Sequence, residues 1–144
     1  MPLPPSGECM SPRKTIVDEF FRALGSGDSA AMSSLISEDV VATAHGSSLM
    51  SGQRNYSEVL EALTMLSQVT KDGIEFEILS MTEEEDRVSC EAVGTSVLVT
   101  GQDYNNRYHF LFRFSGGQIS TIDEYFDTKL VDELFGPIVQ ESAK

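Results

Sequence analysis

The chain has 144 residues, of which 40% are hydrophobic, and a formal net charge of −13 from 10 basic and 23 acidic side chains. This length suits one domain with its own core. The acidic balance excludes a nucleic-acid surface, which needs a basic face, and argues against binding to anionic membranes. No stretch approaches the roughly 18 apolar residues of a membrane span.

The two cysteines, Cys9 and Cys90, lie far apart and lack the spacing of a metal site. Unpaired cysteines are typical of a reducing compartment, so we expect no disulfide. The first 14 residues contain no apolar segment of the kind found in a signal peptide. Together these features predict a cytoplasmic protein.

The first half of the chain predicts three helices and one brief strand. Residues 1–11 are rich in Pro, Ser and Gly, and we expect a disordered tail there. Capping residues and helical spacing of apolar side chains predict a helix from Pro12 to Gly25 and a second, short helix over 29–36. A brief strand over 40–44 precedes a third helix at 56–69.

The second half predicts a meander of strands, because apolar and polar residues alternate there. The expected strands are residues 74–78, 87–99, 104–114 and 118–126. A short helix from Thr128, stopped by Gly136 and Pro137, would leave 137–144 as a tail. Helices segregated from a largely antiparallel sheet predict one α+β domain over 12–136. We expect its curved, mixed sheet to wrap around the N-terminal helices and enclose a conical apolar pocket.

The most informative stretch is the final hairpin, residues 104–127. Alternation places Glu124 on one face of the last strand with Ile122 and Phe126, and Asp123 on the opposite face. An apolar cone disfavours the ionised carboxyl and raises its pKa toward neutrality, where a general acid or base works best. The sequence therefore predicts Glu124 as a catalytic acid or base. The alternative is a structural carboxylate bonded to a neighbouring strand.

Polar side chains elsewhere are candidates for supporting that chemistry. Tyr108 and Asn106 lie on the strand face that the hairpin turns toward Glu124, and a phenol and an amide can donate hydrogen bonds to a developing enolate oxygen. The alternative is that the tyrosine hydroxyl only satisfies its own burial. His45, at the end of the short strand, is a further catalytic candidate as a proton carrier. Because the two histidines have no partner at metal-ligand spacing, we expect no metal.

Apolar residues of the helices and strands are expected to line the pocket as well as form the core. Ala92 and Gly94 are small, so an inward orientation would widen the cavity for a bulky ligand. The predicted substrate-binding residues are Phe20, Leu24, Met32, Leu63, Leu66, Ala92, Gly94, Phe110 and Phe126.

Three stretches resemble a known family. They are VDEFFRALGSGD at 17–28, SEDVVATAHG at 37–46 and YNNRYHFLFRFSGGQISTIDEYFD at 104–127. Together they are similar to the SnoaL-like branch of the nuclear transport factor two-like superfamily, which also contains ketosteroid isomerases and limonene epoxide hydrolases. The resemblance implies a cone-shaped α+β barrel with a pocket for a small apolar molecule.

When the functional residues of the family are compared with this sequence one by one, a single acid is matched. Glu124 matches the acid that SnoaL-like cyclases and limonene epoxide hydrolases place on the last strand. The stretch 91–94 does not supply the Arg and Asp of the epoxide hydrolases. Ala44 and Phe110 stand where ketosteroid isomerases carry their base and their buried Asp. The resemblance therefore implies the pocket and one acid, but not the catalytic residues of the epoxide hydrolases or of the ketosteroid isomerases.

The implied function is a SnoaL-like enzyme acting on an apolar, oxygen-bearing metabolite of polyketide or terpenoid type. We expect proton-transfer chemistry, either isomerisation, aldol-type cyclisation or hydration, without a cofactor. The resemblance also implies a homodimer through the outer face of the sheet, where Arg107, His109 and Arg113 are expected. The alternatives are a non-catalytic lipophile-binding protein and a dimeric scaffold or adaptor.

Overall fold

The computed structural model describes residues 10–142. Most of the tail expected at 1–11 therefore lies outside the described residues. The elements are α1 (Pro12–Ser26), α2 (Ser29–Leu35), β1 (Ile36–Ala44), β2 (Gly52–Arg54), α3 (Tyr56–Val69), β3 (Glu75–Glu84), β4 (Arg87–Thr95), β5 (Asn106–Ser115), β6 (Gln118–Phe126) and α4 (Thr128–Ser142).

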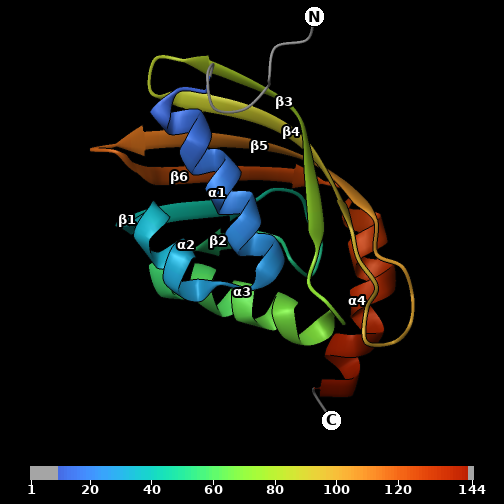
Figure 1. Ribbon diagram of the computed structural model, residues 1–144. Helices are drawn as coiled ribbons and strands as arrows, with labels where there is room; N and C mark the ends of the chain where they lie inside the picture. Colours follow the sequence, from blue (N-terminus) through green and yellow to red (C-terminus); the bar gives the residue numbers. More distant parts are fainter. Residues whose placement is uncertain (1–9, 143–144) are drawn as a thin grey trace, which may run out of the picture.

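The six strands form one curved, open sheet in the order β2-β1-β6-β5-β4-β3. Strands β1 and β6 run parallel, and the other neighbouring pairs are antiparallel. Figure 1 shows α1 and α3 within the curve of the sheet and α4 beside the end toward which β3 and β4 bend. The predicted α+β class, with a curved mixed sheet around the N-terminal helices, is confirmed.

Local capping sets where the first three helices begin. The side chains of Ser11 and Asp28 accept hydrogen bonds from backbone N–H groups in the first turns of α1 and α2. Asn55 and Glu58 form a reciprocal capping box at the start of α3. Gly27 ends α1 in the left-handed conformation, with φ 74°. These contacts join residues close in sequence, which is why the helix starts were predictable.

The fourth helix does not stop at Gly136 and Pro137, as the sequence suggested, but continues through Pro137 to Ser142. Proline removes one backbone hydrogen bond from a helix. Leu134 and Ile138, on either side of Pro137, pack against the same apolar cluster. This packing offsets the lost bond and extends the helix into the expected tail.

The strand boundaries differ from the prediction where the sheet is irregular. A β-bulge between Ile78 and Ser80 interrupts the alternation of β3, so the visible pattern ended early although the strand continues to Glu84. The expected strand over 87–99 ends at Thr95. Beyond it the chain leaves the sheet, and Leu98 forms an isolated bridge with Thr70 at the end of α3.

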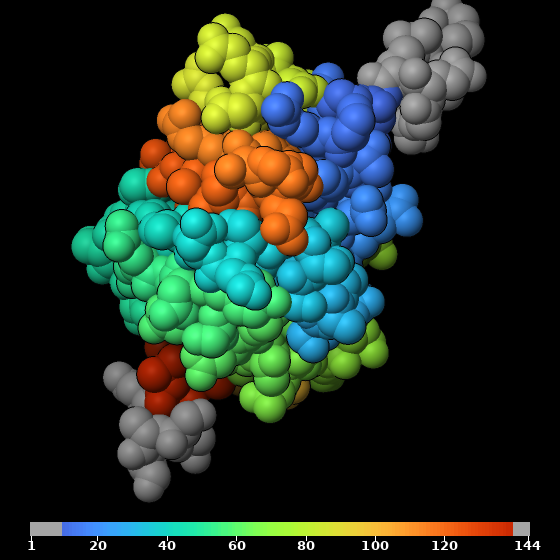
Figure 2. Space-filling model, turned by 90° about the vertical axis from the view of Figure 1, so that its left-hand side faces the viewer, coloured from blue at the N-terminus to red at the C-terminus, as the bar shows by residue number. Residues whose placement is uncertain are grey.

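The core lies between the helices and the concave face of the sheet. Phe20 and Phe21 of α1 pack edge-on against Phe112 of β5, with ring centroids 5.0 and 6.1 Å apart. At the other end, Tyr104 meets Phe135 of α4 at 5.0 Å. In Figure 2 the β5–β6 turn (orange) lies between α1 (blue) and α2 with β1 (cyan), so the hairpin closes this side of the molecule.

Candidate functional site

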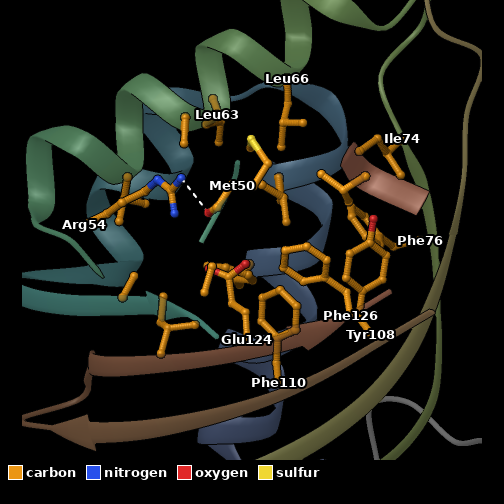
Figure 3. A pocket seen from close by; sticks show the side chains of 18 of the residues that line it. Met50, Arg54, Leu63, Leu66, Ile74, Phe76, Tyr108, Phe110, Glu124 and Phe126 are labelled. Carbon is orange, nitrogen blue, oxygen red and sulfur yellow. Dashed lines mark hydrogen bonds between the residues drawn. The ribbon is translucent and has the colours of Figure 1, made fainter. Parts of the chain in front are cut away.

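A cavity of about 90 Å³ lies between the helices and the inner face of the sheet. Every helix contributes to its wall, as do β1, β2, β3, β5 and β6. The wall is apolar except for four side chains, Arg54, Tyr104, Tyr108 and Glu124 (Figure 3). The volume is small beside the ~300–1,000 Å³ typical of pockets for drug-sized ligands. The space therefore favours a compact molecule over the bulky one expected from the sequence.

Seven of the nine predicted substrate-binding residues line this cavity. They come from both sides of it, from α1, α2 and α3 as well as from β5 and β6. The seven are Phe20, Leu24, Met32, Leu63, Leu66, Phe110 and Phe126.

Ala92 and Gly94 do not line the cavity, so the expectation that they widen it is wrong. Ala92 is fully buried in the main apolar cluster. A Cβ atom added to Gly94 would lie 3.0 to 3.2 Å from side-chain atoms of Ile74, Phe76 and Tyr108. The space above these small residues is therefore filled by the protein's own side chains.

Glu124 reaches the cavity from the middle of the sheet. It pairs with Ala44 of β1 on one side and with Phe110 of β5 on the other. Its side chain points into the cavity (Figure 3), and the residue as a whole is half-buried. Within residues 10–142 no hydrogen-bond donor contacts its carboxyl group, and none contributes to its pKa.

The environment of Glu124 shifts the titration of its carboxyl group to near-neutral pH. Burial raises the pKa of Glu124 from the ordinary value of 4.5 to about 7, and the nearby Arg54 and His45 oppose part of that rise. A carboxyl with such a pKa exchanges protons readily at neutral pH. It is suited to act as a general base in one step and as a general acid in the next.

Two tyrosines form a connected pair of donors in the same cavity. The hydroxyl of Tyr108 donates to the hydroxyl oxygen of Tyr104 at 3.1 Å. Asn106 Nδ2 donates to the same oxygen at 3.0 Å. The Tyr104 oxygen thus accepts two hydrogen bonds, and among the described residues no acceptor is recorded for its own proton. Burial raises the pKa of both phenols, so both remain protonated donors at neutral pH.

Asn106 does not line the cavity and is committed to structural contacts. Besides its bond to Tyr104, its Nδ2 donates to the Asp127 carbonyl oxygen at 3.2 Å. Its Oδ1 accepts from the backbone N–H groups of Arg107 at 2.8 Å and of Asp127 at 3.3 Å. The expectation that Asn106 donates to a substrate is therefore wrong. Its amide instead holds the hydroxyl of Tyr104 in place.

Sequence analysis missed two polar residues of the cavity, Tyr104 and Arg54. Tyr104 shares the two-residue alternation of Asn106 and Tyr108, so the pattern contained a signal for it. Arg54 lies on β2, a three-residue edge strand of mostly exposed residues. This strand was not predicted, because Gly-Gln-Arg has no alternation of apolar side chains.

His45 does not face the cavity, which corrects its assignment as a pocket proton carrier. Its Nε2 lies 2.8 Å from Asp123 Oδ1, and its ring stacks on Tyr125 with centroids 4.5 Å apart. Asp123 and Tyr125 lie on the face of β6 opposite to Glu124. His109 also lies on the outer face, within 2.8 Å of Ser89 Oγ. Both histidines therefore belong to the convex surface.

The part of the chain that the structure describes contains no group of three or more His, Cys, Asp or Glu side chains arranged to hold a metal ion. Within the same residues, no helix is both long enough and apolar enough to cross a membrane.

Solved structures with the same architecture come from several organisms. The structure of PrhC from Penicillium brasilianum NBRC 6234 has a TM-score of 0.78 at 19% identity, over 92% of this chain and 93% of that one. TerC, co-crystallised with polyporic acid, has a TM-score of 0.75 at 18% identity, over 88% and 99%. AclR from Streptomyces galilaeus, described as a putative hydroxylase, has a TM-score of 0.71 at 18% identity, over 90% and 92%. At such identities the likeness shows the fold alone.

Among curated proteins none matches this sequence significantly. The sequence profile of the SnoaL-like domain matches residues 17–122, which is most of the chain. The matched region contains β1, the core helices and the last strand as far as Ile122. Solved structures of the same architecture include proteins described as NTF2-like and as having a ketosteroid isomerase-like fold. The chain therefore belongs to the SnoaL-like family, and its fold is that of the NTF2-like proteins.

Proposed function

We propose that this protein binds a compact, apolar, oxygen-bearing molecule and catalyses proton transfer on it, as in an isomerisation, an aldol-type cyclisation or a hydration. One observation carries the proposal. The carboxyl of Glu124 projects into an apolar cavity without a hydrogen-bond partner among the described residues, and its pKa is raised to about 7. A carboxylate with only a structural role would be expected to have a partner.

In the proposed reaction, the Glu124 carboxylate removes a proton from a carbon next to a carbonyl group. The electron pair of the C–H bond forms a carbon–carbon double bond, and the π electron pair of the carbonyl group moves to its oxygen, which gives an enolate. The free proton of Tyr104 donates a hydrogen bond to that oxygen, and Tyr108 holds Tyr104 in place. In an isomerisation, the protonated Glu124 returns the proton to a different carbon of the conjugated enolate, and the carbonyl group forms again. In an aldol-type cyclisation, the enolate carbon attacks a second carbonyl of the same molecule, and the resulting alkoxide oxygen takes the proton from Glu124.

The comparisons support a small organic ligand without naming it. TerC was co-crystallised with polyporic acid, and AclR is described as a putative hydroxylase. The apolar wall supports the same class of ligand, because it would exclude water and hold the reactive conformation.

The test compares two neighbouring carboxyls on opposite faces of β6. Wild type, Glu124→Gln and Asp123→Asn are each passed through native cell extract, and the small molecules that they retain are identified by mass spectrometry. Each retained compound is then incubated with each protein in D₂O, and deuterium incorporation is followed. We expect wild type and Asp123→Asn to exchange deuterium, and Glu124→Gln to bind with exchange slowed by roughly 10²-fold or more.

Other outcomes identify the alternatives. Retention without exchange in the wild type would indicate a non-catalytic lipophile-binding protein. An empty cavity together with a stable protein partner would indicate a scaffold or adaptor.

A further inference from the structure

Within residues 10–142, Arg54 is the one cation on the wall of the cavity, and it donates a single hydrogen bond to the protein there. Its Nη2 donates to the backbone carbonyl of Met50 at 2.9 Å. Among the described residues Arg54 takes part in no ion pair, since the ion pairs involve other residues. A guanidinium has five N–H donors, so donors remain for a ligand.

Small residues of β1 lie between Arg54 on β2 and Glu124 on β6. Ala42 of β1 pairs with Arg54 on one side and with Ile122 on the other. Ala44, two residues further along, pairs with Glu124. Both alanines are buried and line the cavity. No side chain larger than a methyl group therefore rises from β1 between the cation and the acid.

Among residues 10–142, the positive charge of Arg54 has no anionic partner in the space between Arg54 and Glu124 when Glu124 is protonated. Glu124, whose pKa is raised to about 7, is mostly neutral at about pH 6, which leaves Arg54 as a positive charge beside an apolar wall. Arg54 is half-buried, so its charge is less screened on the cavity side than in open water and would attract an anion that enters the cavity. The planar guanidinium fork matches a carboxylate in particular, because two parallel N–H groups can bind its two oxygens.

We propose that the ligand of this cavity is a small monocarboxylic acid, whose carboxylate binds Arg54 over Ala42 while its apolar body lies toward the phenyl rings of the wall. In Figure 3, Arg54 and Tyr108 lie on opposite sides of Glu124. A short oxo acid would thus span the cavity, with its carboxylate at Arg54, its carbonyl near the tyrosines and the intervening carbon beside Glu124. The identity of the substrate class rests on the proposed function, whereas the binding of the carboxylate does not.

The test uses butanoate as the probe and butanamide, its neutral counterpart of similar shape, as the control. Each is titrated into wild type, Arg54→Met, Arg54→Lys and Glu124→Gln, and the backbone amide signals of Ala42 and Ala44 are followed by NMR. Measurements at about pH 6 lie below the pKa of Glu124, which is about 7. Unchanged thermal unfolding verifies that each variant is folded.

We expect wild type to bind butanoate roughly tenfold or more tightly than butanamide, because a charge-assisted pair is stronger than a neutral one. Arg54→Met should lose this preference, Arg54→Lys should keep part of it, and Glu124→Gln should keep it fully. Equal binding of acid and amide by wild type, no saturable binding of butanoate, or a preference that survives in Arg54→Met would each overturn the proposal. If the proposed catalytic function is wrong but the carboxylate site is right, the protein would still prefer butanoate over butanamide. The compounds retained from extract would then exchange deuterium equally with wild type and Glu124→Gln.

Discussion

Two adjacent acids on β6 have different environments because a strand sends successive side chains to opposite faces. Asp123 lies on the convex side and meets His45 at 2.8 Å. Glu124 lies on the concave side, where burial raises its pKa to about 7. One step along the backbone thus separates a paired surface carboxylate from a candidate acid–base catalyst.

The raised pKa of Glu124 makes folding stability depend on pH. The folded state binds the proton more tightly than the unfolded state, so this contribution to stability is fully present below about pH 4.5 and is lost as the pH rises through about 7. We expect Glu124→Gln to gain stability relative to wild type across this window, by up to about 3 kcal/mol at about pH 8. Urea denaturation of both proteins from pH 4.5 to 8 measures the difference, and a flat difference would contradict the assigned environment.

Asn106 is expected to act on stability, because its amide links the start of β5 to the end of β6. Removing it in Asn106→Ala leaves the hydroxyl of Tyr104 and two backbone groups of Asp127 without their partner. We expect a loss of about 2–4 kcal/mol in the free energy of unfolding. Tyr108→Phe, which removes a single donated bond, should cost only about 1 kcal/mol. Equal losses in urea denaturation would contradict this ranking.

At the scale of the elements, the position of α1 against β3 depends on a close approach of two backbones. The backbone N–H of Ile74 donates to the carbonyl oxygen of Gly25 at 2.9 Å. A Cβ atom at Gly25 would lie 2.2 Å from the carbonyl oxygen of Ile74. Only glycine permits this approach, which anchors the end of α1 to the start of the curved strand that forms one wall of the cavity.

Two helical glycines provide a matched comparison of this packing. Gly25→Ala forces the backbones apart and should destabilise the protein by about 2 kcal/mol or more. A Cβ atom at Gly136 would meet nothing within 4 Å beyond its chain neighbours and its own helix. Since Pro137 disfavours a side chain at the preceding helical position, the gain in helix propensity is offset, and Gly136→Ala should change stability by less than about 1 kcal/mol. Thermal unfolding of both variants checks this difference in size. A stabilising Gly25→Ala would show that α1 does not pack so closely.

At the scale of the whole molecule, the concave face of the sheet holds the cavity, and its convex face remains available to a partner. Val41 and Tyr125 expose 42% and 48% of their surface on the convex side. His109, Arg107 and Arg113 lie on the same side, as the alternation along β5 predicted. A mixed apolar and charged face of this kind is suited to self-association about a two-fold axis.

We expect the protein to form a homodimer through this convex face, with a mass of twice 15.8 kDa. Tyr125→Glu would place a negative charge on the convex face of each subunit, where the two charges would repel across the expected interface, and shift the protein to the monomer. Val139→Glu is the matched control, because Val139 is also 48% exposed but lies on α4, outside the sheet. Light scattering after size exclusion gives the masses. A monomeric wild type, or equal effects of the two variants, would contradict this arrangement.

The sequence by itself determined the features that depend on neighbouring residues. The caps at Ser11 and Asp28 set helix starts through bonds that span three residues. The alternation around Glu124 identified its face, because opposite side-chain directions are a property of any strand. The order of helices and strands then limited the fold to an α+β class.

Only the tertiary structure decided what surrounds each of these residues. Arg54 enters the cavity because β2 pairs with β1, and Asn106 is occupied because Asp127 lies beside it. The space above Gly94 is filled by Phe76, from a strand whose bulge hid part of its pattern. Such contacts join segments far apart in sequence, and they depend on strand register and side-chain volume. No local pattern encodes these quantities, so the sequence identified the acid but not the cation that faces it.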